Sequence, residues 1–128
     1  MLALVLDDSS AMRSILRRTL KGLGFDVVEA AEVGAALDLA GRTGPIDLAL
    51  VDWNLPGRSG LEFVRGVRSA PDGIRLKVIM VTTELESSRV IEALRAGVDE
   101  YLMKPFTPDM LESKLALLGL AGRTESHD

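Results

Sequence analysis

The 128-residue chain contains no cysteine. Disulfide bonds and metal sites built on thiolates are therefore excluded. Its apolar runs are short: the first, at residues 2–6, falls far below the roughly 20 apolar residues that a membrane-spanning helix needs. No signal peptide is visible either, because Met1 leads into this run without a basic region before it. These absences predict a cytoplasmic protein without membrane insertion.

The chain also lacks a strong excess of charge of either sign. Fifteen lysines and arginines stand against 19 aspartates and glutamates, for a net charge of -4, so nothing indicates a nucleic-acid partner. A composition that is 47% hydrophobic and 27% charged is ordinary for a soluble globular protein. The length fits one domain with a real core. We predict a domain over residues 1–118 and a frayed, polar C-terminal tail over residues 119–128.

Short apolar runs alternate with longer amphipathic segments, which is typical of successive βα units. Most of the runs are apolar on both faces, as in a parallel sheet covered by helices on each side. The sequence therefore predicts an α/β protein with a (βα)5 fold, a doubly wound, five-stranded parallel sheet. We take its strand order to be 2-1-3-4-5, the order of flavodoxin-like folds. The strands are expected at residues 2–6, 25–29, 48–51, 76–81 and 100–103.

Apolar residues at helical spacing predict five helices between and after these strands. Several helix ends carry capping signals. These are Ser9 or Ser10 before the first helix, a capping box from Ser59 to Glu62 at the third, Gly97 after the fourth, and Thr107 with Pro108 at the fifth.

Polar side chains follow four of the five strands at the points where these end. Asp7 and Asp8 follow the first strand, Asp52 follows the third, a hydroxyl pair at residues 82 and 83 ends the fourth, and Lys104 follows the fifth. In an open parallel sheet, ligands bind outside the carboxyl ends of the strands, where the strand order reverses. For the order 2-1-3-4-5 this point lies between the first and third strands, so these side chains are expected to converge there.

The converging groups suit a metal-assisted transfer of a phosphoryl group. Three crowded carboxylates repel one another, which raises at least one pKa unless a cation is bound, and Mg²⁺ prefers such oxygen ligands. A carboxylate can attack phosphorus to give an aspartyl phosphate. The metal and Lys104 would neutralise charge on the transferring group, while the Thr82 hydroxyl donates to one of its oxygens.

Each of these residues alone also has a plain structural interpretation. Asp8 could cap the first helix, Asp52 could belong to a turn, and Lys104 could be a solvated surface lysine. Tyr101 could be a half-buried strand residue whose hydroxyl lies in water. The ordered placement of all the needed groups at successive strand ends favours a functional site.

Over residues 2–118 the sequence resembles a response-regulator receiver domain of two-component signalling. A finer match, in residues 52–56 and 101–107, is to the single-domain chemotaxis regulators of that family. The motifs that carry the resemblance are Asp7-Asp8-Ser9, Val51-Asp52-Trp53-Asn54-Leu55-Pro56, Gly60, Val81-Thr82 and Lys104-Pro105-Phe106.

The resemblance implies a role for each site residue. Asp52 is the phosphoacceptor, and it takes its group from a phosphohistidine on a sensor histidine kinase or phosphotransfer protein. Asp7, Asp8 and Asp52, with the backbone carbonyl of Asn54, hold Mg²⁺. Lys104 pairs with the phosphoryl group, and a cis bond before Pro105 aims it into the site.

The resemblance also implies a switch. Thr82 moves towards the phosphoryl group and Tyr101 swings inward behind it, which changes the surface formed by the fourth helix, fifth strand and fifth helix. Two further positions, Asn54 and Glu84, tune the lifetime of the phosphoryl group, and this pair indicates relatively fast self-hydrolysis. Thr83 stands where the family usually has a smaller residue, so we regard it as a possible access gate to Asp52.

The function expected from these features is that of a stand-alone regulator. It would bind a target such as the flagellar motor switch, and it would not be an enzyme beyond catalysing its own phosphorylation and dephosphorylation. A phosphorelay intermediate, or a receiver domain of a larger signalling protein, remains an alternative within the family. More distant alternatives are a Mg²⁺-dependent aspartate-nucleophile phosphatase, whose Asp-x-Asp spacing is absent at Asp7, and a flavin binder, whose phosphate Asp7 and Asp8 would repel.

Overall fold

The protein is a five-stranded parallel sheet between two layers of helices, as the sequence predicts. The computed structural model describes residues 1–70, 75–83 and 87–120, apart from the side chains of residues 87 and 88. The strand order is β2-β1-β3-β4-β5, and neighbouring strands are parallel throughout. The strands are β1 (Leu2–Leu6), β2 (Asp26–Ala30), β3 (Leu48–Val51), β4 (Lys77–Thr82) and β5 (Glu100–Met103).

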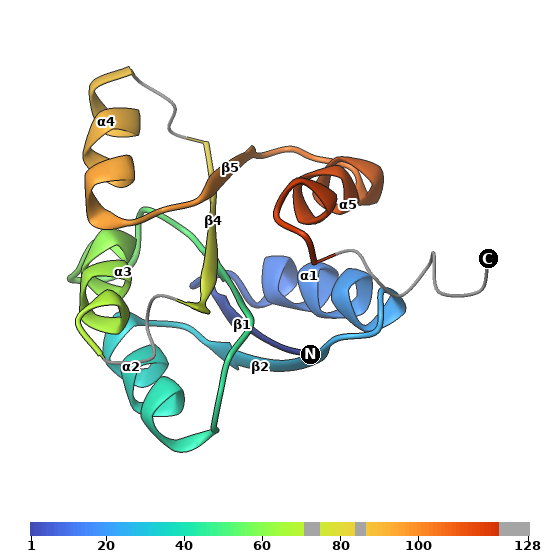
Figure 1. Ribbon diagram of the computed structural model, residues 1–128, viewed down its shortest axis with the longest axis horizontal. Helices are drawn as coiled ribbons and strands as arrows, with labels where there is room; N and C mark the ends of the chain where they lie inside the picture. The colour runs from blue at the N-terminus through green and yellow to red at the C-terminus, as the bar shows by residue number, and fades with distance from the viewer. Residues whose placement is uncertain (71–74, 84–86, 121–128) are drawn as a thin grey trace.

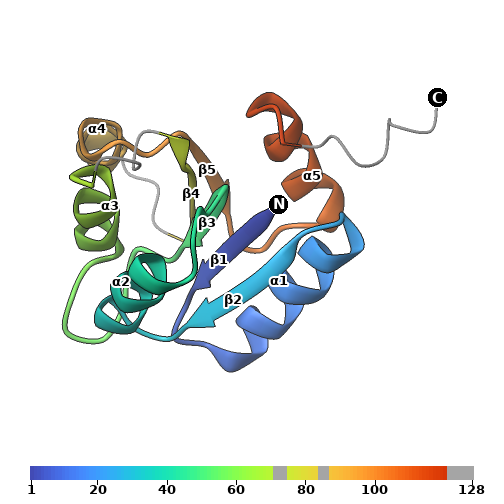
Figure 2. The same cartoon turned by 60° about the horizontal axis from the view of Figure 1, so that its bottom comes forward.

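Helices cover both faces of the sheet (Figures 1 and 2). Alternate strand residues therefore enter two separate cores, one packed against α1 and α5 and the other against α2, α3 and α4. None of the described helices is long and apolar enough to cross a membrane. The helices are α1 (Ser10–Gly22), α2 (Val33–Arg42), α3 (Gly60–Arg68), α4 (Ser87–Ala96) and α5 (Pro108–Leu117).

Two predicted strands begin and end one residue too early. Phe25 precedes β2 because its N–H donates to the carbonyl of Leu20 at 3.0 Å, which closes the end of α1. Leu76 likewise precedes β4. Both side chains are buried in the core, so the apolar pattern identified core residues correctly but not the ends of the hydrogen-bonded ladders.

The predicted caps are confirmed, and Ser9 rather than Ser10 is the N-cap of α1. Its Oγ accepts a hydrogen bond from the Met12 N–H at 3.1 Å. At α3, Ser59 Oγ accepts from the Leu61 N–H and the Ser59 N–H donates to Glu62, which completes the capping box.

The predicted frayed tail begins two residues too early. The N–H groups of Gly119 and Leu120 donate to the carbonyls of Ala116 and Leu115, at 3.1 and 2.8 Å, and so end α5 in a Schellman arrangement. Leu120 also packs against the core. Residues 121–128 lie outside the described residues, so for them the tail stays a prediction.

The strand ends are held level by main-chain hydrogen bonds that continue past the strands. Asp7 N–H donates to the carbonyl of Ala30 at 3.1 Å, and Asp52 N–H donates to that of Leu6 at 2.8 Å. At the far side, the Lys104 N–H donates to the carbonyl of Thr82 at 3.0 Å. The backbones of the predicted site residues are therefore fixed at one edge of the sheet.

Gly60 lets α3 begin directly against the chain that leaves β3. Its N–H donates to the Trp53 carbonyl at 2.8 Å. A Cβ atom at this position would lie 2.0 Å from the carbonyl oxygen of Asp52 and 2.8 Å from Val51 Cγ1. Because the first of these contacts is with backbone, the chain around Asp52 would have to move to accept a side chain.

We expect Gly60→Ala to lower the free energy of unfolding by about 1–3 kcal/mol, as overpacking typically does. The matched control is Gly41→Ala in α2, where a Cβ meets nothing within 4 Å. That control should be neutral or stabilising by up to about 1 kcal/mol, because alanine favours helix over glycine. Urea denaturation of both variants measures the two effects, and equal stabilities would contradict the close approach at Gly60.

Candidate functional site

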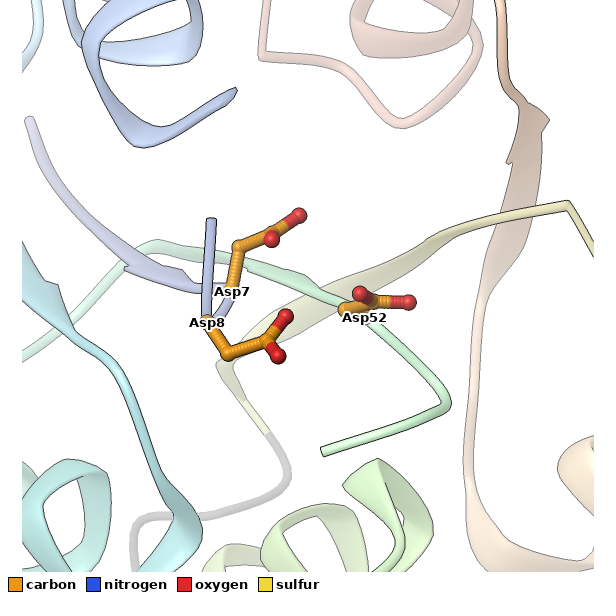
Figure 3. Close-up of side chains that lie close together, drawn as sticks. All are labelled: Asp7, Asp8 and Asp52. Atoms are coloured by element: carbon orange, nitrogen blue, oxygen red, sulfur yellow. The ribbon is translucent and has the colours of Figure 1, made fainter. Parts of the chain in front are cut away.

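Three carboxylates meet at the carboxyl ends of β1 and β3 (Figure 3). Asp7, Asp8 and Asp52 each offer a carboxylate oxygen, and these oxygens lie within 4.8 Å of one another. Asp7 and Asp52 are buried, whereas Asp8 is exposed to solvent. An all-oxygen, carboxylate-rich donor set that is open on one side fits a small hard cation such as Mg²⁺, which keeps several waters. The cluster that the sequence predicts is therefore brought together.

Lys104 reaches this cluster from the end of β5. Its Nζ lies 3.0 Å from Asp7 Oδ2 and 3.4 Å from Asp52 Oδ2, so one ammonium group bridges two of the three carboxylates. The Lys104–Pro105 peptide bond is cis, as the resemblance implies. The lysine is therefore no solvated surface residue. It places a positive charge beside Asp52, the carboxylate for which the resemblance predicts a phosphoacceptor role.

Burial and neighbouring charges set the protonation of the site. Burial raises the pKa of the Asp52 carboxyl, the charge of Asp7 raises it further, and Lys104 only partly offsets the two. For Lys104 itself, burial lowers the pKa, but the hydrogen bond to Asp7 and the charges of both aspartates outweigh it and raise the pKa. Lys104 thus stays an ammonium, while ionised Asp52 is costly in the metal-free protein.

Thr82 and Tyr101 occupy the two strands beyond Asp52. Thr82 ends β4 and is buried, and its backbone pairs with Met103 of β5. Tyr101 is half-buried, and its hydroxyl donates to the carbonyl of Arg89 in α4 at 3.3 Å. Burial raises the pKa of the tyrosine hydroxyl, so it is a neutral donor. Both residues lie where a change at Asp52 could be passed towards α4 and β5.

The structure adds a contact that the sequence did not reveal. Trp53, next to Asp52, is buried, and its ring stacks on that of Tyr101 with centroids 6.3 Å apart. The guanidinium of Arg89 lies 4.8 Å from the centre of the tryptophan ring, within cation–π range. The only sequence signal was the position of an aromatic residue directly after the acceptor. Its partners come from elements that lie far along the chain.

Three further residues are expected to set the lifetime of the phosphoryl group or access to Asp52. Asn54 is exposed and forms an isolated β-bridge with Ser59, which holds the loop after Asp52. Thr83 is exposed at the end of β4. Glu84 lies outside the described residues. Their assigned roles therefore stay predictions.

Comparison with known proteins agrees with this geometry. Residues 3–116 match the model of the response regulator receiver domain family. The chain is 47% identical over 113 residues to a chemotaxis protein CheY homolog of Campylobacter jejuni, covering 88% of this chain and 87% of that protein.

Solved structures give the same result. The Vibrio cholerae chemotaxis protein CheY4 is similar with a TM-score of 0.86 and 32% identity, over 91% of this chain and 96% of that one. The receiver domain of the Pseudomonas aeruginosa sensor histidine kinase PA1611 has a TM-score of 0.81 and 28% identity, over 91% of this chain and 94% of that one. That structure has a magnesium ion coordinated in its active-site cleft.

We expect Asp52→Asn to stabilise the metal-free protein near neutral pH. Because the folded-state pKa of Asp52 is raised, the protonated carboxyl favours folding, and this contribution is lost as pH rises through the folded pKa. The melting temperature of the variant should therefore exceed that of the wild type near neutral pH in a chelating buffer. The difference should shrink as the pH falls towards the ordinary value of 3.8.

Asp26→Asn is the matched control, since it removes an exposed aspartate of β2 outside the cluster. It separates the loss of one negative charge from the loss of this buried carboxyl. An Asp52→Asn melting temperature equal to or below that of the wild type near neutral pH would show that burying the ionised carboxyl does not destabilise the fold.

Proposed function

Because this chain belongs to the response regulator receiver family, we propose that it is a single-domain regulator of the chemotaxis type whose phosphoacceptor is Asp52. The observation that carries the proposal is the meeting of Lys104, from the end of β5, with Asp7 and Asp52, from the ends of β1 and β3. A buried acid with a raised pKa beside a fixed ammonium suits a group that must become a nucleophile only when cationic partners are in place.

The chemistry at Asp52 is the transfer of a phosphoryl group from a phosphohistidine. One carboxylate oxygen bonds to phosphorus as the phosphorus–nitrogen bond breaks, and the electron pair of that bond stays on the imidazole nitrogen. Asp7, Asp8 and Asp52, with the backbone carbonyl of Asn54, would hold a magnesium ion, which would supply positive charge beside the phosphoryl oxygens when bound.

The chain's own groups supply the remaining stabilisation. Lys104 Nζ lies 3.4 Å from Asp52 Oδ2 and stays protonated. It pairs with the carboxylate before the transfer and with the phosphoryl oxygens after it. The buried Thr82 hydroxyl donates to one of those oxygens. The protein is not an enzyme acting on a separate substrate. It catalyses the gain and the hydrolytic loss of its own phosphoryl group, and Asn54 and Glu84 tune the rate of loss.

The signal leaves the site through Thr82 and Tyr101. When Thr82 moves towards the phosphoryl group, Tyr101 follows, and its contacts with Trp53 and with Arg89 of α4 rearrange. The outer face of α4, β5 and α5, which we call the α4–β5–α5 surface, then binds the target. This surface already exposes apolar side chains suited to docking, at Leu94, Met103 and Met110, which are 58%, 41% and 44% exposed.

The proposed partners are those expected of a protein similar to these chemotaxis regulators. A sensor histidine kinase or a phosphotransfer protein donates the phosphoryl group, and the target in the cytoplasm is a component such as the flagellar motor switch. The support for this assignment is that the similar proteins are chemotaxis proteins matched over most of their length.

Acetyl phosphate with Mg²⁺ is expected to add one phosphoryl group to the wild type and none to Asp52→Asn, because only a carboxylate at this position can attack phosphorus. Intact mass measures the addition. Fluorescence of Trp53, the only tryptophan, should change in parallel, since this residue follows Asp52 directly in the chain and its ring stacks on Tyr101. Asp109→Asn, in the first turn of α5, is a control that should be phosphorylated normally. An unchanged wild-type mass would overturn the proposed function.

Thr83→Ala is expected to speed phosphorylation by acetyl phosphate several-fold, because a smaller side chain at this exposed position widens access to Asp52. The rate is read from Trp53 fluorescence after mixing. Thr19→Ala is a suitable control, since the Thr19 hydroxyl donates to the Ile15 carbonyl within α1. Equal rates for the wild type and Thr83→Ala would remove the gate from the proposal without affecting the phosphoacceptor.

A further inference from the structure

Asp7 is fixed on every side. Its N–H donates to the Ala30 carbonyl, its Oδ1 accepts from the Ser9 N–H at 2.9 Å, and its Oδ2 faces Lys104. The fourth contact comes from α1, where Arg13 Nη1 donates to the Asp7 carbonyl at 2.7 Å. The orientation of the residues that would face the cation therefore depends on a guanidinium one turn into the next helix.

The other side of this guanidinium is paired with β2. Arg13 Nε donates to Glu29 Oε1 at 3.2 Å, and Arg17 Nη1 contacts the second carboxylate oxygen of Glu29. The side chains of Arg13 and Glu29 are 20% and 25% exposed, so solvent screens the pair only in part. Glu29 thus joins α1 to β2 and directs Arg13 towards the end of β1.

The charge of Arg13 creates a conflict that Glu29 resolves. A guanidinium against the main chain of Asp7 would repel a divalent cation bound by the neighbouring carboxylates, and the repulsion would extend over several ångströms. A carboxylate in direct contact with that guanidinium cancels most of the repulsion and leaves the hydrogen bond to the Asp7 carbonyl in place.

We propose that Arg13 is a positioning residue of the divalent-cation site and that Glu29 neutralises it, so that the pair orients the loop of Asp7 and Asp8 without repelling the cation. This inference rests on the proposed function, because it assumes that these aspartates bind Mg²⁺. Outer partners that orient metal ligands commonly change metal affinity by about 10–100-fold when they are removed.

The test is the Mg²⁺ affinity of the unphosphorylated protein, followed by Trp53 fluorescence and by calorimetry. Arg13→Met keeps an unbranched apolar stem but loses both contacts, and it should bind Mg²⁺ about tenfold more weakly. Arg13→Lys should fall between Arg13→Met and the wild type, because an ammonium lacks the planar fork that serves both partners at once. Arg42→Met breaks an exposed ion pair with Asp38 in α2 and should leave the affinity unchanged.

Glu29→Gln tests the neutralising role separately. It keeps an acceptor for Arg13 but removes the charge, so Mg²⁺ affinity should fall several-fold at low salt, with a smaller loss near 1 M salt, where the screening length is about 3 Å. In a protein that already carries Arg13→Met, the same change should have a clearly smaller effect, because the guanidinium that lies against Asp7 is gone and Glu29 then faces only Arg17. A purely structural role would predict neither the salt dependence nor this non-additivity.

The outcomes separate this inference from the proposed function. A wild type without Mg²⁺ affinity would overturn both. A wild type that binds Mg²⁺ while Arg13→Met binds it equally well would overturn only the role of Arg13. Circular dichroism checks the fold of each variant. If Arg13→Met unfolds, Arg13→Lys and Glu29→Gln decide the question. Wild-type Mg²⁺ affinity and salt dependence in both of these variants would then contradict the inference.

Discussion

The site depends on one constraint, the level alignment of the carboxyl ends of the parallel strands. Hydrogen bonds from Asp7, Asp52 and Lys104 to neighbouring strands continue the ladder by one residue beyond the sheet. Each of these residues is thus part of the sheet's backbone pattern, while its side chain lies beyond the sheet's edge. A shift of any strand by one residue would turn its side chains to the opposite face and disperse the cluster.

The charged side chains at these strand ends contribute little to the stability of the fold. Asp7 and Lys104 are largely buried, and an ion pair of this kind often contributes no more to folding than an apolar pair would. Burial raises the pKa of Asp52, so in the metal-free protein the ionised form of this carboxyl is less favourable than it would be in water. A bound divalent cation would supply the positive charge that this arrangement lacks, so the arrangement is explained by chemistry rather than by stability.

Two sets of contacts leave the cluster in different directions. On one side, Trp53, Tyr101 and Arg89 connect the loop after Asp52 to α4. Aromatic stacking and cation–π contacts of this kind can adopt alternative packings at modest cost. On the other side, Arg13 and Glu29 connect Asp7 to α1 and β2 through a charged hydrogen-bonded pair. The first set is suited to movement and the second to holding the loop in place.

The sequence by itself determined the fold class, the helix caps and the residues at the strand ends, because each depends on local patterns such as apolar periodicity or a capping hydroxyl. The strand order 2-1-3-4-5 was predicted correctly as well, but from the order known for such folds rather than from a local pattern. The sequence also predicted the convergence of Asp7, Asp8, Asp52 and Lys104, since parallel strands must bring their carboxyl ends to one edge. It did not determine where β2 and β4 begin, or that Gly119 and Leu120 close α5, because those limits depend on which hydrogen bonds form. Only the tertiary structure decided that Trp53 is buried against Tyr101 and that Arg13 supports Asp7. Those contacts join side chains from separate elements, and their geometry follows from packing rather than from any local sequence signal.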